Sequence, residues 1–557
     1  MKVSFSKLGS AMSEYTATVI DTTGIQKYIF GSNRLKENIG ASHLVKLATN
    51  QWVKKCLEEL FPSRVYIPDE TKEEVKPIIN IDEKINAELV YAGGGNTVLL
   101  FRSEKYAREF TQKLTLKILK EAPGLNIVIA HHPFDWDQQL LQDIMENHLI
   151  KCQLDAQKRQ PRPSVPLLSL SVTANCRSTG LVAVEDTDGK YGIKGEGYLA
   201  SREIIAKLIA ADEANTELKE MLFGDKPSKY KVARDVDDMG RTEQESSYIA
   251  IIHADGNRMG KRFENYIKEE CDRGHSIAEK NEKCIMAMRK LSWAVNQAAS
   301  KAITEVGKLV IDAIETGKFT PKENFLPFRP IVYGGDDITF VCDGRIGLPL
   351  AVKFMKEFEK HTQDLPDGKG KATKATVCAG IAIVKTHYPF SRAYEFCEAL
   401  CANAKNLVRE QTQNYSERKP IFSALDWHIA ASGLIGSIGE IREGEYQGGK
   451  LTIRPMRLHE LEGNDWWMSW TDFAEVVKAF NEQEPWKDKH NKVIALREVL
   501  REGEKATEQF LNAYGIQELP EFSNKANSLL KRQGWLDKFC YYFDAIEAME
   551  FYIPLGE

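Results

Sequence analysis

Short apolar runs and glycine-rich turns recur in the same order in two parts of the chain. Residues 16–30 and 248–263 each begin with a β-rich apolar run, pass through a glycine and end in a helical start. Further on, residues 90–101 and 332–342 each place two apolar runs around glycines, a pattern that predicts a tight hairpin. Two segments of the chain therefore begin with the same succession of elements.

The two segments also continue alike after their hairpins. In each of them a helical pattern leads to a further strand, at residues 125–132 and 376–384. Strand, helix, hairpin, helix, strand is the order of a ferredoxin-like βαββαβ domain. The sequence therefore predicts an α+β chain with an internal repeat of two ferredoxin-like domains.

Four domains follow from this repeat and from the composition of the remaining segments. The first ferredoxin-like domain is expected at residues 1–150 and the second at 246–425. Between them, residues 151–245 are charged and mostly helical in pattern, which indicates a small connecting domain and a linker. Residues 426–557 are helix-rich and predict a helical C-terminal domain.

Three smaller features favour a structural interpretation. The acidic run at 235–240 suggests a metal site, but an acidic linker is the favoured interpretation. Residues 264–320 form a helical insertion in the second domain, and we expect its apolar positions to be core. Tryptophans gather in the last domain, where packing in a helical bundle is favoured over stacking on bases. They are Trp427, Trp466, Trp467, Trp470, Trp486 and Trp535.

Composition and charge narrow the class of protein. The 557 residues are 43% hydrophobic and 28% charged, as in an ordinary globular protein. The chain has no apolar run near the length of a membrane span and no signal-peptide pattern at its start. Its ten cysteines form no CxxC pair, which indicates reduced thiols and a cytoplasmic location. Cys397 and Cys401 lie four residues apart, and we interpret them as buried free thiols rather than half of a metal site.

A formal net charge of −5 excludes strong binding of polyanions by the chain as a whole. A local basic groove or basic partner subunits remain compatible with this charge.

Three aspartates are the candidate catalytic and metal-binding residues. Asp255 ends a predicted strand, and Asp336 and Asp337 follow Gly334 and Gly335 in the second hairpin. Gly and Asp are also the usual residues of a solvated turn, but a ferredoxin-like sheet places its first strand beside the central hairpin. Three adjacent carboxylates repel one another unless divalent cations lie between them, and hard oxygen ligands suit Mg²⁺ or Mn²⁺. Two such ions support in-line displacement at phosphorus.

Other residues near these aspartates could contact a nucleotide. The glycines Gly256, Gly334 and Gly335 would let a triphosphate approach the backbone closely. Lys405, on a predicted helix, could turn its charge toward the triphosphate or remain solvated. The same two interpretations apply to Arg258 and Lys261. Asp255 itself has a structural alternative, as the N-cap of a helix that starts near Asn257.

The first copy of the repeat lacks the aspartates. Alignment of the two copies on their glycines places Thr23, Gly95 and Asn96 at the three aspartate positions. The turn formed by Gly93, Gly94, Gly95 and Asn96 would allow close nucleotide approach without metals, as an acceptor pocket.

Five ordered segments, spread over roughly residues 15 to 425, resemble the large polymerase-like subunit of type III CRISPR effector complexes, of the type III-B kind. They are residues 24–45, 91–101, 253–260, 333–341 and 378–405, the fourth of which contains GGDD. The resemblance implies two palm domains, the second catalytic, and a nucleotidyltransferase that joins ATP 3′–5′ into cyclic oligoadenylates when the complex binds target RNA. It also implies other complex subunits, crRNA and target RNA as partners, and a helical C-terminal domain that contacts small subunits.

The chain departs from the family pattern in three respects. No His-Asp dyad precedes the first palm, and His131 and His132 lack that context, so we expect no metal-dependent DNase. The region after the first palm offers only Cys176, so we expect no zinc. Related enzymes use a second small molecule such as S-adenosylmethionine in place of one ATP, and the sequence leaves that choice open.

Three other functions remain open from the sequence. One is a palm-type cyclase of the diguanylate or adenylate class; two palms in one chain favour ATP oligomerisation over it, because those cyclases pair two identical chains. Another is a non-enzymatic scaffold subunit, against which the three carboxylates argue. The third is a signalling enzyme that acts alone, outside any complex.

Overall fold

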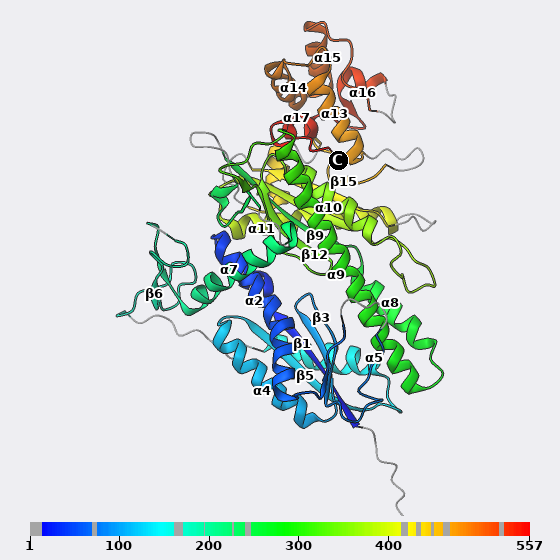
Figure 1. Ribbon diagram of the computed structural model, residues 1–557. Helices are drawn as coiled ribbons and strands as arrows, with labels where there is room; N and C mark the ends of the chain where they lie inside the picture. The colour runs from blue at the N-terminus through cyan, green and yellow to red at the C-terminus, as the bar shows by residue number, and fades with distance from the viewer. Residues whose placement is uncertain are drawn as a thin grey trace, which may run out of the picture. The chain divides into compact units, whose positions relative to one another are not determined.

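The computed structural model describes residues 14–556, with gaps in ten places (Figure 1). The gaps are 70–74, 161–170, 194, 225–227, 240–246, 414–420, 431–435, 447–449, 461–467 and 523–527. The chain divides into two compact units, and each contains one ferredoxin-like sheet. Unit 1 is Met1–Glu220, Arg258–Ala299 and Thr362–Lys374, and unit 2 is Met221–Asn257, Ser300–His361 and Ala375–Glu557.

The sheet of unit 1 has the strand order β2-β3-β4-β1-β5. Its strands are β1 (Glu14–Thr23), β2 (Val65–Tyr66), β3 (Ala87–Gly93), β4 (Asn96–Phe101) and β5 (Asn126–Asp135). Strand β1 lies antiparallel between β4 and β5, which is the ferredoxin-like arrangement, and β2 adds a short parallel edge strand.

The helices of unit 1 follow the predicted order around this sheet. After β1 come α1 (Ile25–Phe30), α2 (Leu35–Lys46), the π-helix η1 (Leu47–Gln51) and α3 (Trp52–Leu60). Helix α4 (Glu104–Glu121) joins β4 to β5; the Ser103 side chain caps its start, and Ala107, Phe110, Leu114 and Ile118 form its buried stripe. After β5 come α5 (Leu141–Asp143), the π-helix η2 (Ile144–Leu154) and α6 (Asp155–Arg159).

The helical insertion of the second palm contributes to both units. It forms α8 (Met259–Asp272) and α9 (Ile277–Glu315), and α9 belongs to unit 1 up to Ala299 and to unit 2 from Ser300. Within unit 1, Cys284, Ile285 and Met288 pack into the core of the first sheet. Leu291, Ala298 and Ile303 are buried as predicted, whereas Met286, Trp293 and Ala294 are half-buried.

Two buried polar side chains fix the insertion in unit 1. Arg289 makes an ion pair of 2.7 Å with the fully buried Glu88 and donates to the carbonyl oxygens of Leu89 and Val90. Asn281 donates to the carbonyl oxygen of Trp136. Such satisfied buried groups specify one register of packing.

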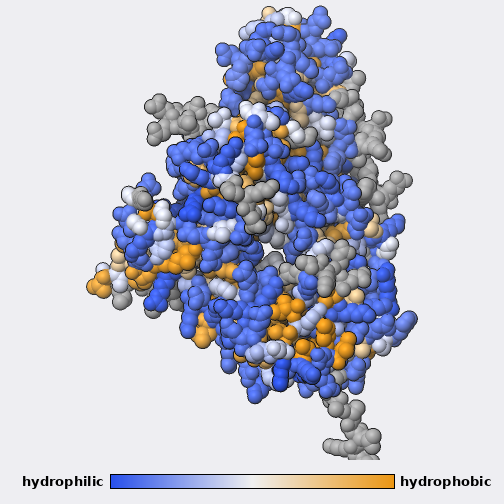
Figure 2. Space-filling view, viewed as in Figure 1, coloured by the Kyte–Doolittle hydropathy of each residue, from blue (hydrophilic) through white to orange (hydrophobic). Residues whose placement is uncertain are grey.

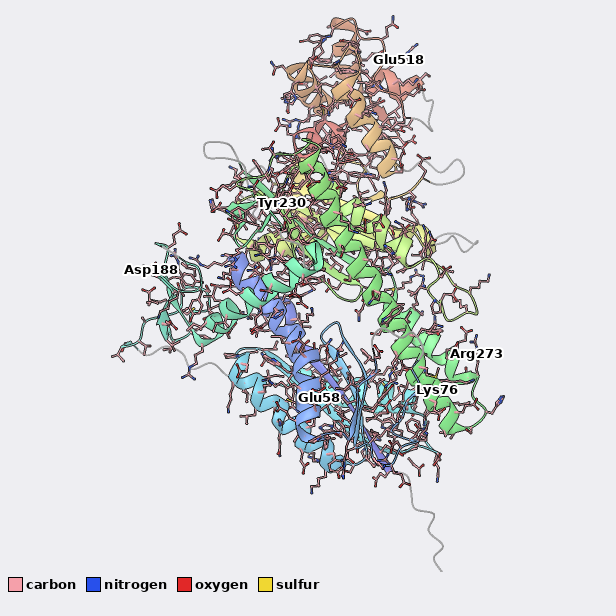
Figure 3. The ribbon with its side chains drawn as sticks, in the orientation of Figure 1. Glu58, Lys76, Asp188, Tyr230, Arg273 and Glu518 are labelled. Atoms are coloured by element: carbon pink, nitrogen blue, oxygen red, sulfur yellow. The ribbon has the colours of Figure 1, made fainter. Side chains whose placement is uncertain are left out.

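The connecting region packs a small core against α7 (Arg202–Phe223). Its two short strands are β6 (Glu185–Asp186) and β7 (Leu199–Ala200). Asp188, labelled in Figure 3, ties the intervening loop together by accepting a hydrogen bond of 2.9 Å from Gly195 N. Cys176 is buried in this small core.

The sheet of unit 2 has the order β11-β12-β9-β13-β14-β15, from green to yellow in Figure 1. Its strands are β9 (Tyr248–Gly256), β11 (Phe328–Val332), β12 (Asp337–Asp343), β13 (Val377–Lys385), β14 (Ala424–Ile429) and β15 (Met456–Arg457). The first four have the same ferredoxin-like order as the sheet of unit 1. Strand β14 carries the sheet beyond residue 425, because it pairs in parallel with β13.

Two helices pack on this sheet, α10 (Gly347–His361) and α11 (Phe390–Gln413). Before the sheet, β8 (Lys231–Val232) pairs with β10 (Phe325–Leu326). The acidic run forms the short 3₁₀ helix η3 (Val236–Asp238), where the carboxylates of Asp235 and Asp238 accept backbone N–H groups as a capping box. This use of its carboxylates fits the linker interpretation.

The rest of unit 2 is mostly helical. Its elements are α12 (Ile438–Glu445), α13 (Trp470–Glu482), α14 (His490–Glu502), α15 (Glu504–Ala513), α16 (Ser528–Gln533), β16 (Trp535–Leu536), β17 (Phe539–Cys540), α17 (Phe543–Ala548) and η4 (Met549–Phe551). Trp427, Trp470, Trp486 and Trp535 are buried, so aromatic packing is confirmed for these four, while Trp466 and Trp467 lie outside the described residues. The predicted α+β class with two ferredoxin-like domains and a helical C-terminal region is confirmed. Across the described part of the chain, no helix has the length and apolarity needed to span a bilayer.

Candidate functional site

The register of the second sheet brings the three aspartates together. Asp337, the first residue of β12, lies directly opposite Asp255 near the end of β9. Asp336 is joined to the same point because its carbonyl oxygen accepts a hydrogen bond of 3.1 Å from Gly256 N. Like charges directly opposite on adjacent strands destabilise a sheet, so this pair favours a positive charge beside it; that a metal ion supplies this charge stays a prediction.

The hairpin before these aspartates requires glycine for conformational reasons. Gly334 has φ 138° and Gly335 has φ 89°, a region that side-chain-bearing residues rarely adopt. A Cβ on Gly334 would meet no atom within 4 Å, so the space beside the turn is open. The turn can therefore accept a ligand close to its backbone.

The alternative role of Asp255 as a helix cap is wrong. Helix α8 begins at Met259, and its N-cap is Arg258, in the left-handed conformation with φ 55° and without a side-chain capping bond. Asn257 is held elsewhere, because its side-chain amide donates to Thr376 Oγ1 at 3.0 Å. Asp255 is thus left for Lys405 and for a ligand. Arg258 and Lys261 are exposed, and both interpretations of them stay predictions.

Lys405 on α11 forms an ion pair with Asp255 through its Nζ. Partial burial lowers the pKa of Lys405, but the hydrogen bond and charge of Asp255 outweigh burial and raise it. Lys405 is therefore not simply a solvated lysine, and its contact with a triphosphate stays a prediction.

The other two carboxylates are difficult to ionise together. Desolvation and the charge of Asp255 raise the pKa of Asp336 to about 6, and the same two causes raise the pKa of Asp337 to about 7. The Asp337 side chain is 53% exposed, so solvent reduces the energetic cost of this repulsion. A divalent cation bound among the three oxygens would remove the repulsion, so the donor set fits Mg²⁺ or Mn²⁺.

Three further residues, which the sequence analysis missed, lie beside the site. His253 Nδ1 lies 3.4 Å from Asp337 Oδ1 and 3.4 Å from Thr339 Oγ1, and its ring packs edge-on against Tyr394 at 5.7 Å. Desolvation raises the pKa of Glu398, and the charge of Asp337 raises it further. The signal was available for His253, which precedes Asp255 by two residues and so lies on the same face of the strand.

The cysteines near the site are buried thiols, as predicted. Cys397 Sγ donates to Gly380 O at 2.8 Å and to Ile251 O at 3.1 Å, and Cys401 Sγ donates to Cys378 O at 3.3 Å. Within the ranges that the structure describes, no three His, Cys, Asp or Glu side chains form a group suited to a metal. The three aspartates do not form such a group either, so a metal site there stays a prediction.

The first sheet contains residue pairs equivalent to those of the site. The alignment between the two sheets differs, however, from the one predicted from the sequence. There Asn96 lies opposite Asp21, as Asp337 lies opposite Asp255. Thr22 N donates to Gly95 O at 3.2 Å, which matches the bond between Gly256 and Asp336. The equivalent of Asp255 is therefore Asp21, and the alignment of Thr23 with Asp255 is wrong by two residues.

The cause of the error is the identity of the aligned glycine. Gly24 is the left-handed N-cap of α1, with φ 65°, and its counterpart is Arg258 rather than Gly256. The hairpin alignment holds, since both hairpins have a bulge at the same place, before Tyr91 and before Val332. Asp21 even forms an ion pair with Lys158, as Asp255 does with Lys405.

The first hairpin adjoins a cavity of about 130 Å³ within unit 1. Tyr91 and Ala92 of β3 line one side, and Trp293 and Asn296 of α9 line another. A Cβ on Gly93 would come within 3.0 Å of the Asn296 amide, so this glycine permits close packing of the helix. The other residues named for this turn, Gly94, Gly95 and Asn96, form its tip, and Gly94 has open space beside it.

The fold and the site together define a palm domain with a GGDD hairpin. Residues 248–413 match the family model described as Cas10/Cmr2, second palm domain. Residues 248–413 are therefore a Cas10-like palm domain, and the resemblance to the large subunit of type III CRISPR complexes is confirmed.

One solved structure supports the same fold. A Csm1–Csm4 cassette in complex with cA3 aligns with a TM-score of 0.51 and 12% identity, over 97% of this chain and 70% of that chain. Csm1 in T. onnurineus aligns with a TM-score of 0.49 and 12% identity, over 97% and 69%. At these identities the likeness concerns the fold alone. No curated protein matches the sequence.

Proposed function

We propose that this chain is the nucleotidyltransferase subunit of a type III CRISPR RNA-guided complex. Its substrate would be ATP, and its product a cyclic oligoadenylate or a related adenylate messenger made when target RNA is bound. The main supporting observation is that Asp255 and Asp337 lie opposite each other on paired strands, with Asp336 and Lys405 beside them, in a segment that matches the Cas10/Cmr2 palm. The Csm1–Csm4 structures with cA3, with AMPPNP and with one ATP add support, as does the presence of other complex subunits in them.

Asp255, Asp336 and Asp337 would hold two divalent cations. Bound there, Mg²⁺ or Mn²⁺ would supply charge neutralisation and acidify the attacking hydroxyl. The raised pKa values of Asp336 and Asp337 support this assignment, because they mark carboxylates placed for a cation rather than for solvent.

The chain's own residues would position the donor nucleotide. The open turn at Gly334 and Gly335 would admit the triphosphate, and Lys405 would hold Asp255 in orientation and balance its charge. The 3′-hydroxyl of an acceptor would attack the α-phosphorus of the donor, and pyrophosphate would leave. Positioning then accounts for most of the catalysis expected from the protein.

The first palm would hold the acceptor. Its turn, Gly93 to Asn96, has Gly95 and Asn96 where the second palm has Asp336 and Asp337. The first palm keeps Asp21, the counterpart of Asp255, with its lysine partner. A site of this kind could bind a nucleotide without activating it. S-adenosylmethionine would be an alternative acceptor to a second ATP, and product analysis separates the two.

The decisive experiment is nucleotide turnover with product identification. The purified chain, alone and in its complex with target RNA, is incubated with labelled ATP or GTP and Mg²⁺ or Mn²⁺, with and without S-adenosylmethionine, and products are resolved by mass spectrometry. Asp336→Ala/Asp337→Ala should abolish synthesis. A control, Asp272→Ala/Asp312→Ala, removes two exposed helical carboxylates and should leave synthesis unchanged.

Thermal unfolding gives a second readout that does not depend on turnover. Mg²⁺ should raise the Tm of the wild-type chain and not of Asp336→Ala/Asp337→Ala, because only the former binds the cation in its folded state. Without metal, the double variant should be at least as stable as wild type, since one source of charge repulsion is gone. Normal turnover by the double variant would contradict the site, GTP-only products would indicate another palm-type cyclase, and absence of product with RNA bound would favour a scaffold subunit.

A further inference from the structure

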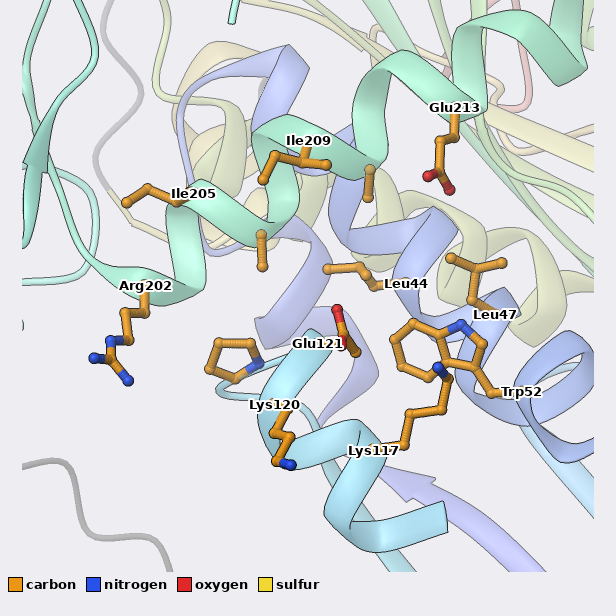
Figure 4. A pocket seen from close by; sticks show the side chains of 13 residues that line it. Leu44, Leu47, Trp52, Lys117, Lys120, Glu121, Arg202, Ile205, Ile209 and Glu213 are labelled. Carbon is orange, nitrogen blue, oxygen red and sulfur yellow. The ribbon is translucent and has the colours of Figure 1, made fainter. Parts of the chain in front are cut away.

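A groove within unit 1, formed by none of the residues of the carboxylate site, lies between α7 and the C-terminal end of α4. Its cavity has a volume of about 440 Å³, within the range typical of binding pockets. Figure 4 shows α7 along one side with Arg202, Ile205 and Ile209, and α4 along the other with Lys117 and Lys120. Neither the proposed reaction nor the repeat accounts for this groove.

Its walls are apolar although they face solvent. Helix α7 buries Ile204, Leu208 and Ala211 on one side, which leaves Ile205 and Ile209 on the groove side. Ile209 is 52% exposed. Trp52 closes the other end. Ile205, Ala206, Ile209 and Ala210 thus form a short apolar strip along α7, with Ile209 as its exposed member.

The surroundings of the groove have the same character. Figure 2 shows apolar surface over β6 and α7. Among the described residues, most of the exposed large hydrophobic side chains belong to unit 1 rather than to unit 2. Those of unit 1 are Ile81, Leu116, Leu119, Leu140, Ile150, Val172, Val184, Leu199 and Ile209.

The charges at the rim favour an acidic occupant. Lys120 and Arg202 form no ion pair with any residue that the structure describes. Lys117 extends over the Trp52 ring at 5.3 Å and keeps its charge at the surface. Three basic side chains, Lys117, Lys120 and Arg202, and two acidic ones line the groove, so its lining has a net charge of +1.

We propose that this groove docks an amphipathic helix of a partner protein subunit, with apolar anchors in the groove and carboxylates toward Lys120 and Arg202. The proposal rests on the proposed function, which makes the chain one subunit of a complex. A helix between two helices buries anchors spaced three or four residues apart, which fits an elongated apolar groove. RNA is disfavoured as the occupant, because nucleic-acid sites depend on many cations and on exposed stacking faces rather than on isoleucine walls.

The test is assembly of the full chain with the other subunits of its complex, co-expressed and measured by native mass spectrometry and by titration of the purified subunits. Ile209→Glu places a charge in the groove and should weaken association at least about tenfold. Lys120→Glu/Arg202→Glu should weaken it as well, and the loss should shrink at high salt. Ile209→Gln is the milder variant should the glutamate disturb α7.

Matched controls share the chemistry but lie outside the groove. Ile81→Glu alters an apolar side chain that is 68% exposed in the same unit, and Lys105→Glu alters a lysine of α4 that is 80% exposed. Both should assemble as wild type does. In hydrogen exchange, residues 113–121 and 202–213 should be protected in the complex relative to the free chain.

Each outcome decides the proposal. Assembly lost in the groove variants and kept in the controls and in Asp336→Ala/Asp337→Ala supports docking, whether or not the complex makes product. Wild-type assembly by the groove variants would refute docking and leave the proposed function standing. Normal assembly with weakened binding of a labelled single-stranded RNA would assign the groove to nucleic acid instead. A wild-type chain that makes product yet joins no subunit would refute docking and the place in a complex together.

Discussion

A methyl group at Gly380 tests whether α11 positions Lys405 for the carboxylate site. Gly380 lies on β13 opposite His253, beneath α11. A Cβ at this position would lie 2.0 Å from the carbonyl oxygen of Cys397 and 3.0 Å from Leu400 Cβ. Ordinary contact begins at 3.4 Å, so the helix backbone would have to move away from the sheet by about 1.4 Å.

Two effects of different size follow from this displacement. Overpacking of a core costs about 1–3 kcal/mol of unfolding free energy, which lowers the Tm of a domain of this size by roughly 2–4 °C per kcal/mol. Lys405 moves with the helix and loses its contact with Asp255. Because misplacement by about 1 Å can cost roughly 10²-fold in rate, Gly380→Ala should lose far more activity than stability.

The assay measures Tm and adenylate synthesis on the same preparation. Gly444→Ala is the matched control, since Gly444 lies in α12 with no atom within 4 Å of the new Cβ. It should keep full activity and gain up to about 1 kcal/mol, because Ala has the higher helix propensity. Wild-type turnover by Gly380→Ala would refute the argument that the position of α11 controls the site.

Two further predictions concern histidines of unit 2. His253→Leu removes the ring 3.4 Å from Asp337 Oδ1, so the Mg²⁺ concentration for half-maximal synthesis should rise several-fold, with partial recovery in His253→Gln; an unchanged metal titration would show that His253 does not orient Asp337. His428 is buried, and desolvation with the charges of Arg454 and Arg442 lowers its pKa to about 3. Its neutral form is favoured by folding, so stability is full above about pH 6.5 and falls by roughly 1.4 kcal/mol per pH unit as pH drops from there toward 3. Neither ring nitrogen has a hydrogen-bond partner among the described residues, so His428→Phe should flatten this acid slope in urea unfolding at pH 7 and pH 5, and equal slopes would contradict the assignment.

Local patterns were sufficient to predict the repeat and the candidate ligands. The order of apolar runs and glycine turns requires two βαββαβ units, because strand and helix periods are set by residues close in sequence. The same patterns place Asp255 at a strand end and Asp336 and Asp337 in a turn. Once the topology is known, their proximity follows, since the first strand of this fold always pairs with the hairpin.

Patterns of this kind could not fix the register of the repeat. Thr23 and Asp21 both end the same strand, and only the cross-strand pair with Asn96 shows that Asp21 is the counterpart of Asp255. Register depends on hydrogen bonds between segments about 75 residues apart, which local propensity does not encode.

The sequence by itself determined the fold class, the two palm domains and the three aspartates. Only the tertiary structure decided that Lys405 contacts Asp255, that His253, Tyr394 and Glu398 adjoin the site, and that the first half of α9 packs on the first sheet. It also brought α4 and α7 together into an apolar groove with a basic rim. The physical reason is that each of these features depends on the distance between distant segments, which is set by the packing of whole elements.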